Sequence, residues 1–348
     1  MKKQNKKIAT ITFHWATNYG AVLQAFALQK HLKNQGHETE IIDYFPLLTS
    51  SIQRLMMLKS KNREFFRKEK KIKRFRKKEL TLSKRRYYNH SSLELASDKY
   101  SAVICGSDQI WNCSFTTPRR LPNNLSYFLD FAGDAKRIAY AASFGSTDIP
   151  DKMKALITPE LEKFARISVR EQTGAAILKD LGFEAEVVAD PTLLLTSEDY
   201  RELLRHKKLP EAPRVFSYVL HGDQNALDIS HVVCDHFGQE DIVRENNCCI
   251  YEWLALEKDA EFIVTNSFHG TVFALLFHTP FLTAAIKGSG MNDRIYTLLK
   301  SVGLESRIAE GFSADKINEI INSPINWDEV DQKIAALRER SAEFLSDI

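Results

Sequence analysis

The chain has 348 residues, 44% of them hydrophobic and 27% charged, and its formal net charge is +3 at pH 7. This composition is that of a globular protein, and the length suggests two domains of about 100–200 residues each. The longest apolar stretch, residues 271–286, contains His278 and Pro280 and is shorter than the roughly 20 residues of a membrane-spanning helix. The N-terminus lacks a signal-peptide pattern, so we expect a cytoplasmic protein.

The cysteines give a second exclusion. The chain contains Cys105, Cys113, Cys234, Cys248 and Cys249, an odd number without any Cys-x-x-Cys spacing. This pattern argues against a disulfide framework and against a structural zinc site. We therefore expect reduced thiols.

Strand-like and helix-like segments alternate along the chain. In the first half, the expected strands cover residues 8–13, 39–44, 102–105, 137–143, 167–169 and 186–189. In the second half, strands at 215–220, 261–265 and 281–285 alternate with helices at 224–237, 251–257, 271–277 and 295–302. Such alternation predicts an α/β fold with two doubly wound, Rossmann-like domains at residues 1–195 and 196–325. We expect the final helix, within residues 326–348, to pack back on the first domain.

Residues 50–98 interrupt this alternation. Between Lys59 and Arg86 lie fifteen Lys or Arg residues and only three Glu. We interpret the segment as an inserted basic helical hairpin or arm. Two roles stay open for residues 59–86, a solvated helical face or attachment to an anionic membrane surface. The segment has no recognition motif for nucleic acid, which we do not expect as a partner.

Ligands of open parallel sheets bind beyond the carboxyl ends of the strands, so the loops there are the candidate sites. In the first domain, these loops contain Asn18, Tyr19, Gly20, Ser107, Asp108, Gln109, Asn112 and Ser143. The turn that ends at Gly20 can present backbone N–H groups to an anion, or it is only a connection between strand and helix. It is not a Gly-x-Gly-x-x-Gly motif, so dinucleotide binding is not supported.

Three charged side chains complete the candidate site. Arg170 follows a predicted strand, where its guanidinium suits a carboxylate or phosphate; the alternative is an ion pair with Glu171 or another acid at the surface. His269 follows the strand at 261–265 and opens a helix, as expected of a general acid or base. Arg294 ends a flexible loop and is either a second anion-binding group or part of the start of the next helix.

Taken together, these segments resemble the polysaccharide pyruvyl transferase family. The matching stretches run in order from residue 8 to about 303. They include Asn18-Tyr19-Gly20-Ala21-Val22-Leu23-Gln24-Ala25, Gly106-Ser107-Asp108-Gln109-Ile110-Trp111-Asn112, Tyr140-Ala141-Ala142-Ser143-Phe144-Gly145, Ser168-Val169-Arg170-Glu171, Ala189-Asp190-Pro191-Thr192 and Ser267-Phe268-His269-Gly270.

The resemblance implies a GT-B-like fold and transfer of pyruvate from phosphoenolpyruvate to sugar hydroxyls as a cyclic ketal, in the synthesis of a surface polysaccharide such as a capsule. It implies that Arg170 binds the donor and that His269 acts as general acid or stabilises the departing phosphate. The implied chemistry demands no metal and no cofactor. A lipid-pyrophosphate-linked sugar at the inner face of the membrane would be one acceptor, and the basic segment would then hold the enzyme at that surface.

One position departs from the family pattern. Relatives often have Arg-x-His where this chain has Ser267-Phe268-His269, so a second donor-binding arginine is missing at Ser267. Arg294 is the candidate replacement. Two alternatives follow from the fold and from this departure. They are a GT-B-type glycosyltransferase that uses a nucleotide sugar, and a non-catalytic member of the family that binds saccharide or a partner protein.

Overall fold

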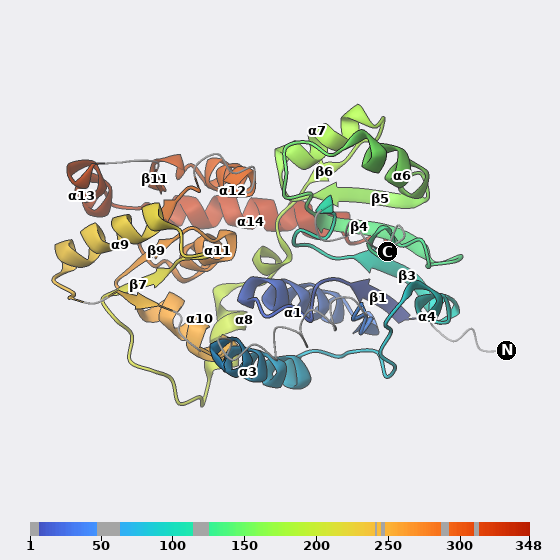
Figure 1. Cartoon of the computed structure of the whole chain (residues 1–348), viewed down its shortest axis with the longest axis horizontal. Helices are drawn as coiled ribbons and strands as arrows, with labels where there is room; N and C mark the ends of the chain where they lie inside the picture. The colour runs from blue at the N-terminus through green and yellow to red at the C-terminus, as the bar shows by residue number, and fades with distance from the viewer. Residues whose placement is uncertain are drawn as a thin grey trace. The chain divides into compact units, whose positions relative to one another are not determined.

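The computed structural model describes residues 7–46, 63–113, 125–240, 242–244, 248–286, 292–309 and 313–348. The chain divides into two compact units. The first unit comprises Met1–Leu194 together with Arg340–Ile348, and the second comprises Leu195–Glu339. Each is built around its own parallel sheet, as Figure 1 shows.

The first unit contains a six-stranded sheet in the order β2-β1-β3-β4-β5-β6. Its strands are β1 (Lys7–Ile11), β2 (Thr39–Ile41), β3 (Tyr100–Cys105), β4 (Lys136–Ala142), β5 (Phe164–Val169) and β6 (Glu186–Val187). Every neighbouring pair is parallel. The carboxyl ends of β1, β3, β4 and β5 therefore lie at one edge, where the predicted loops begin. A register shift between Ala139 and Ala142 marks a bulge in β4 just before Ser143.

Alternate residues of these strands face two hydrophobic clusters, as the two-residue period of a strand requires. Ile8 and Ala102 pack with Leu28 and Leu32 of α1 (Tyr19–Asn34). Their neighbours Ala9 and Val103 lie in the opposite cluster, with side chains of α6 (Asp151–Leu161) and α7 (Gln172–Asp180). Helices on both faces of the sheet explain why its strands are apolar along most of their length.

The basic segment differs from a helical hairpin or arm. Within its described residues, the long helix is α3 (Arg63–Glu79), while residues 80–89 are extended and bridge Ile41 to Leu82 and Tyr44 to Tyr87. Short helices α4 (His90–Glu94) and η2 (Ser97–Lys99) lead into β3. Ile72 and Phe75 are buried, and Phe75 packs against Phe26 of α1. The apolar face of α3 explains the difference, because it is covered within the first unit; residues 47–62 lie outside the described residues.

The second unit contains a five-stranded parallel sheet in the order β11-β10-β9-β7-β8. Its strands are β7 (Val215–Tyr218), β8 (Val243–Arg244), β9 (Phe262–Thr265), β10 (Phe281–Ala284) and β11 (Ile308–Ala309). Its helices are α8 (Ser197–Leu204), α9 (Gln224–Phe237), α10 (Ile250–Asp259), α11 (Phe268–Phe277), α12 (Asp293–Val302), α13 (Ala314–Asn322) and most of α14 (Trp327–Phe344). It also contains the short 3₁₀ segment η6 (Glu305–Arg307), whereas the 3₁₀ segments η3 (Ser126–Phe128) and η4 (Pro191–Leu194) belong to the first unit.

The predicted start of one helix and the predicted set of helices need correction. Helix α11 begins at Phe268, three residues before the predicted start, because Ser267 serves as its N-cap. Helices α6, α8 and α13 are absent from the predicted set; α6 begins after Pro150 and contains Pro159, which obscures its helical pattern. The last nine residues belong to the first unit.

Candidate functional site

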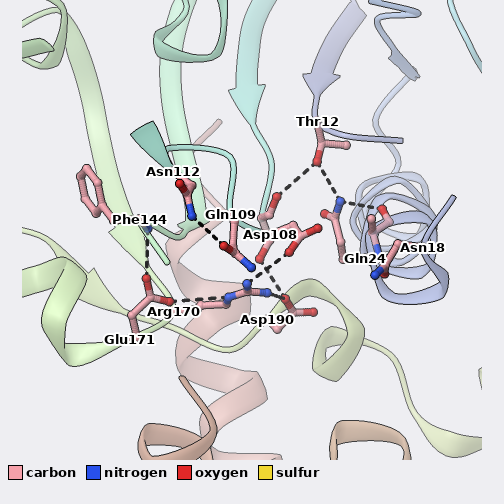
Figure 2. A network of polar contacts seen from close by, with 12 residues as sticks. Thr12, Asn18, Gln24, Asp108, Gln109, Asn112, Phe144, Arg170, Glu171 and Asp190 are labelled. Carbon is pink, nitrogen blue, oxygen red and sulfur yellow. Dashed lines mark hydrogen bonds and ion pairs between the residues drawn. The ribbon is translucent and has the colours of Figure 1, made fainter. Parts of the chain in front are cut away.

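The first cluster of polar side chains lies where β1 and β3 end in the first unit (Figure 2). The Gln24 amide nitrogen donates to Thr12 Oγ1 (2.8 Å) and to the Ala21 carbonyl (2.8 Å). The Thr12 hydroxyl in turn donates to the Ser107 carbonyl (3.2 Å). Gln24 is fully buried. It is not one of the predicted site residues, although it lies in one of the stretches that match the family.

The predicted residues of the first loop have structural positions. Asn18 caps α1, its side-chain oxygen accepting a hydrogen bond from the Ala21 N–H (3.0 Å). Tyr19 and Gly20 belong to the first turn of α1 and are buried, so the Tyr19 side chain does not face solvent. The turn therefore starts the helix one residue earlier than Gly20, which the sequence had suggested as its beginning.

Arg170 lies beyond the end of β5 among three carboxylates (Figure 2). Its guanidinium contacts Asp190 at 2.9 Å, Asp108 at 3.4 Å and Glu171 at 3.6 Å. The Arg170 side chain is only 1% exposed. Burial lowers the pKa of Arg170, but the charges of Asp190, Asp108 and Glu171 outweigh burial and leave the pKa above its ordinary value.

The carboxylates are themselves fixed by the loops. Asp190 accepts hydrogen bonds from the Ser107 hydroxyl (2.9 Å) and from the backbone and side chain of Thr192 (3.0 and 2.6 Å). Glu171 accepts from the Phe144 N–H (3.1 Å). Asp190 and Glu171 are buried, whereas the Asp108 side chain is 19% exposed. Of the three, only Asp108 was a predicted site residue.

Asp108 has an unusual backbone conformation, with φ at +70°. Residues other than glycine seldom adopt a positive φ. When they do, they are often found at functional sites. Nearby, Asn112 donates to Gln109 (2.7 Å), and both side chains contact the position where a Cβ on Gly145 would lie. Gly145 has φ of +62° and this close contact, which together explain the glycine. Ser143 is buried at the end of β4, and its hydroxyl has no hydrogen-bond partner among the described residues.

In the second unit, the loop between β9 and α11 is held from several sides. Thr265 donates to the Tyr218 carbonyl (2.7 Å), and Asn266 exchanges hydrogen bonds with the backbone of Leu220 (2.7 and 3.1 Å). A Cβ on Gly270 would lie 2.5 Å from Thr265 Oγ1, so only glycine lets the helix start this close to β9. His269 is in the first turn of α11 and is 7% exposed.

Two other predicted residues, Ser267 and Arg294, belong to the start of α11 and of α12 respectively. The Ser267 hydroxyl accepts from the Gly270 N–H (3.4 Å) and caps α11. The Phe268 ring lies 5.2 Å from the His269 ring and 5.9 Å from the Arg294 guanidinium. Arg294 is the second residue of α12. The N-terminus of a helix favours anions, so His269 and Arg294 both lie where a negative group would be stabilised.

The described residues contain no group of three or more His, Cys, Asp or Glu side chains arranged to hold a metal ion. The described part of the chain also contains no helix with the length and apolar character needed to cross a membrane. None of the five cysteines, all of which the structure describes, forms a disulfide.

The two α/β units and the polar loops after their strands are consistent with the family that a comparison of sequences identifies. A sequence model of the polysaccharide pyruvyl transferase family matches residues 18–287, which is more than half of the chain. The chain belongs to the polysaccharide pyruvyl transferase family. This result confirms the resemblance and places the chain in a family of transferases. A search of curated proteins finds no significant match.

Solved structures show the fold of this pyruvyl transferase family member. The UDP-GlcNAc 2-epimerase of Neisseria meningitidis, solved with UDP-GlcNAc, matches with a TM-score of 0.56 and 10% identity over 97% of this chain and 99% of its own. The Methanocaldococcus jannaschii UDP-GlcNAc 2-epimerase gives 0.55 and 13% over 98% and 99%. The Rickettsia bellii UDP-N-acetylglucosamine 2-epimerase gives 0.53 and 9% over 98% and 96%. At such identities the likeness concerns the fold alone, which is α/β with two Rossmann-like, GT-B-type units, as predicted.

Proposed function

We propose that this family member is a ketal pyruvyltransferase that moves pyruvate from phosphoenolpyruvate to hydroxyls of a sugar in surface polysaccharide biosynthesis. Membership of the transferase family supports the reaction class. The observation that carries the proposal is the start of α11, where the Phe268 ring lies 5.2 Å from the His269 ring and 5.9 Å from the guanidinium of Arg294, which belongs to the first turn of α12. A donor that carries both phosphate and carboxylate needs such cationic and N–H groups.

The proposed reaction assigns one role to each residue of the second unit. His269 gives a proton to the enol carbon of phosphoenolpyruvate, which creates an oxocarbenium-like centre at the neighbouring carbon. A sugar hydroxyl adds there, the phosphate leaves with the electron pair of its C–O bond, and a second hydroxyl closes the ketal. Arg294 takes the place of the family arginine missing at Ser267 and stabilises the donor's negative charge. Proton transfer and charge stabilisation carry every step, so we propose no cofactor.

Arg170 needs a different assignment from the one its sequence position suggests. Asp190, Asp108 and Glu171 already surround its guanidinium, and a donor would have to compete with them. We assign Arg170 the role of a positioning residue that holds Asp108 and Asp190 at the strand ends. Its direct contact with the donor remains a prediction.

A lipid-linked acceptor is part of the same proposal. Six basic residues of α3 are exposed, namely Arg67, Lys70, Lys73, Arg74, Lys77 and Lys78. Each Lys or Arg near an anionic membrane is worth about 1 kcal/mol of binding free energy. This set, which we call the α3 basic face, would hold the enzyme reversibly at the inner face of the membrane, where a sugar on lipid pyrophosphate would be presented.

The test is phosphate release from phosphoenolpyruvate with a panel of galactosides, glucosides and mannosides, lipid-linked and free. We expect release that requires an acceptor, with a product heavier by one pyruvate ketal. His269→Ala should lower kcat by about 10²–10⁴-fold, as loss of a general acid does. His278→Ala is the matched control, because His278 is a histidine of the same unit that pairs with Asp331 on the surface (2.9 Å).

The alternatives predict other results. Lack of phosphoenolpyruvate binding in calorimetry, together with hydrolysis of a nucleotide sugar, would identify a glycosyltransferase. Binding of a saccharide with neither activity would identify a non-catalytic member of the family.

A further inference from the structure

A cavity of about 700 Å³ lies beside the last strand of the first sheet, and all the residues that line it belong to the first unit. We call it the β6 cavity. Helix α7 forms one wall, and parts of β5, of β6 and of the end of α14 form the others. Its apolar floor includes Ala175, Ala176, Phe183 and Phe344. The cavity therefore offers apolar surface at the edge of the unit.

Four charged side chains also line the β6 cavity, two of each sign. Arg166 pairs with Glu186 at 3.2 Å, donates to the Phe344 carbonyl (2.9 Å), and places its guanidinium 4.2 Å from the centre of the Phe344 ring. Lys179 and Glu184 are exposed, and neither has an ion-pair partner among the described residues. One cation and one carboxylate beside the apolar floor are thus available to a partner.

The two edges of the first sheet differ in how they end. At one edge, residues 80–89 cover β2, and the Ile41 N–H donates to the Thr81 carbonyl (2.9 Å). At the other edge, β6 contributes only Glu186 and Val187, and no further strand of the described chain pairs with it (Figure 1). Proteins usually cover or pair an open sheet edge, and an apolar surface beside one is typical of an interaction site.

The charges select a second copy of this chain as the partner. A two-fold axis brings the same surface of two copies face to face. A surface with one available cation and one available carboxylate complements itself under this rotation, because Lys179 of each copy can meet Glu184 of the other. A partner of a single charge sign would attract one of these side chains and repel the other.

We infer that the β6 cavity is the docking surface of a symmetric homodimer, in which two apolar floors pack together and two Lys179–Glu184 ion pairs join the copies. The inference goes beyond the proposed function and does not depend on it. Arg166 is already fixed by Glu186 and Phe344, so its ordering costs little on association. Exposed ion pairs contribute modestly, so we expect a Kd of about 1–100 μM.

The first experiment is sedimentation velocity of the full chain from about 1 to 200 μM at low ionic strength. Wild type should pass from monomer to dimer over this range. Ala176→Arg should raise the Kd at least about tenfold, because it places a bulky cation on the apolar floor. Ala155→Arg is the matched control, because Ala155 is also exposed on a helix of the first unit and does not line the cavity. Arginine is a good helix former, and thermal melts check that both variants fold.

The second experiment exchanges the charges. Lys179→Glu alone and Glu184→Lys alone should each raise the Kd about 10–100-fold, because each brings like charges together across the axis. An equimolar mixture of the two variants should form a heterodimer with the affinity of wild type, since each new charge then meets its opposite. Restored dimerisation cannot come from a change in folding, because each variant alone stays monomeric.

Three results would overturn the inference. The first is a wild type that remains monomeric at every concentration. The second is a dimer that tolerates Ala176→Arg as well as it tolerates Ala155→Arg, which would locate the contact elsewhere. The third is a mixture of the two charge variants that stays monomeric, which would show that Lys179 and Glu184 do not meet across a two-fold axis.

Discussion

At the scale of single residues, the sequence predicts where a side chain lies in the fold better than it predicts which groups contact that side chain. His269 and Arg294 are close to one ring at a helix start, which their places after consecutive strands suggested. Arg170 lies at the expected strand end beside Glu171, the ion-pair partner that the sequence suggested, yet its other two carboxylate partners, Asp108 and Asp190, are distant in the chain. Those contacts depend on the register of the parallel strands, which a pattern of apolar residues does not specify.

Glu257 gives a prediction at this scale. It lies on α10, is fully buried, and neither of its carboxylate oxygens has a hydrogen-bond partner among the described residues. Burial raises its pKa well above the ordinary value. Between the unfolded and folded pKa values the native state binds more protons, so the free energy of unfolding falls as the pH rises.

We expect this fall to begin near pH 4.5 and to approach about 1.4 kcal/mol per pH unit until the folded pKa is reached. Glu257→Gln should remove this part of the slope, as measured by urea unfolding across a pH series. Glu261→Gln is the control, because Glu261 is about half exposed and pairs with Arg214. Equal slopes in wild type and Glu257→Gln would contradict the prediction.

At the scale of an element, α3 is one basic helix with two different faces. The sequence shows its charge but not its two faces, because the apolar positions are few. The Arg76 side chain is buried, donates to the carbonyls of His14 (3.3 Å), Trp15 and Ala16 (3.4 Å), and pairs with Glu69. Glu69 also accepts from Thr17 (2.7 Å). The inner face of α3 thus fixes the loop before α1, while the α3 basic face is exposed.

Substitutions on the two faces should have different effects. Replacement of Lys70, Arg74 and Lys77 by Gln should weaken binding to anionic vesicles about a hundredfold, at about 1 kcal/mol per charge, and leave the Tm unchanged. Arg76→Met should lower the stability by about 3 kcal/mol, because it leaves Glu69 and three carbonyls without their donor. Vesicle sedimentation and thermal melts measure the two properties. Wild type that fails to sediment with the vesicles at moderate salt would refute the membrane role, and an unchanged Tm for Arg76→Met would refute the inner-face role.

At the scale of the whole molecule, alternation of strands and helices was sufficient to predict two α/β units, because parallel sheets covered on both faces require that pattern. The prediction placed the division of the chain at residue 195, and the structure divides it between Leu194 and Leu195. The strand order could not be derived in this way. The strand order depends on the crossover connections, and the length of a connection does not indicate at which edge of the sheet the next strand pairs. The helices α8 and α13 were missed because they have only 8 and 9 residues, so that the helical period is repeated about twice.

The last nine residues allow a test of this division. Phe344 and Leu345 are buried against Ile8, Ala102, Ile138 and Tyr140, and the Ser341 hydroxyl accepts from the Ala189 N–H (2.8 Å). Burial of two such apolar side chains contributes about 3–6 kcal/mol to the first unit. A chain that ends at Glu339 should therefore lose amide hydrogen-exchange protection in β4 and β5, while β7 and β9 keep theirs. Leu345→Ala in the full-length chain should show a weaker form of the same pattern, because it removes one side chain and keeps the helix. Equal loss of protection in both sheets would show that the two units unfold together, so that the C-terminal residues stabilise the chain as a whole.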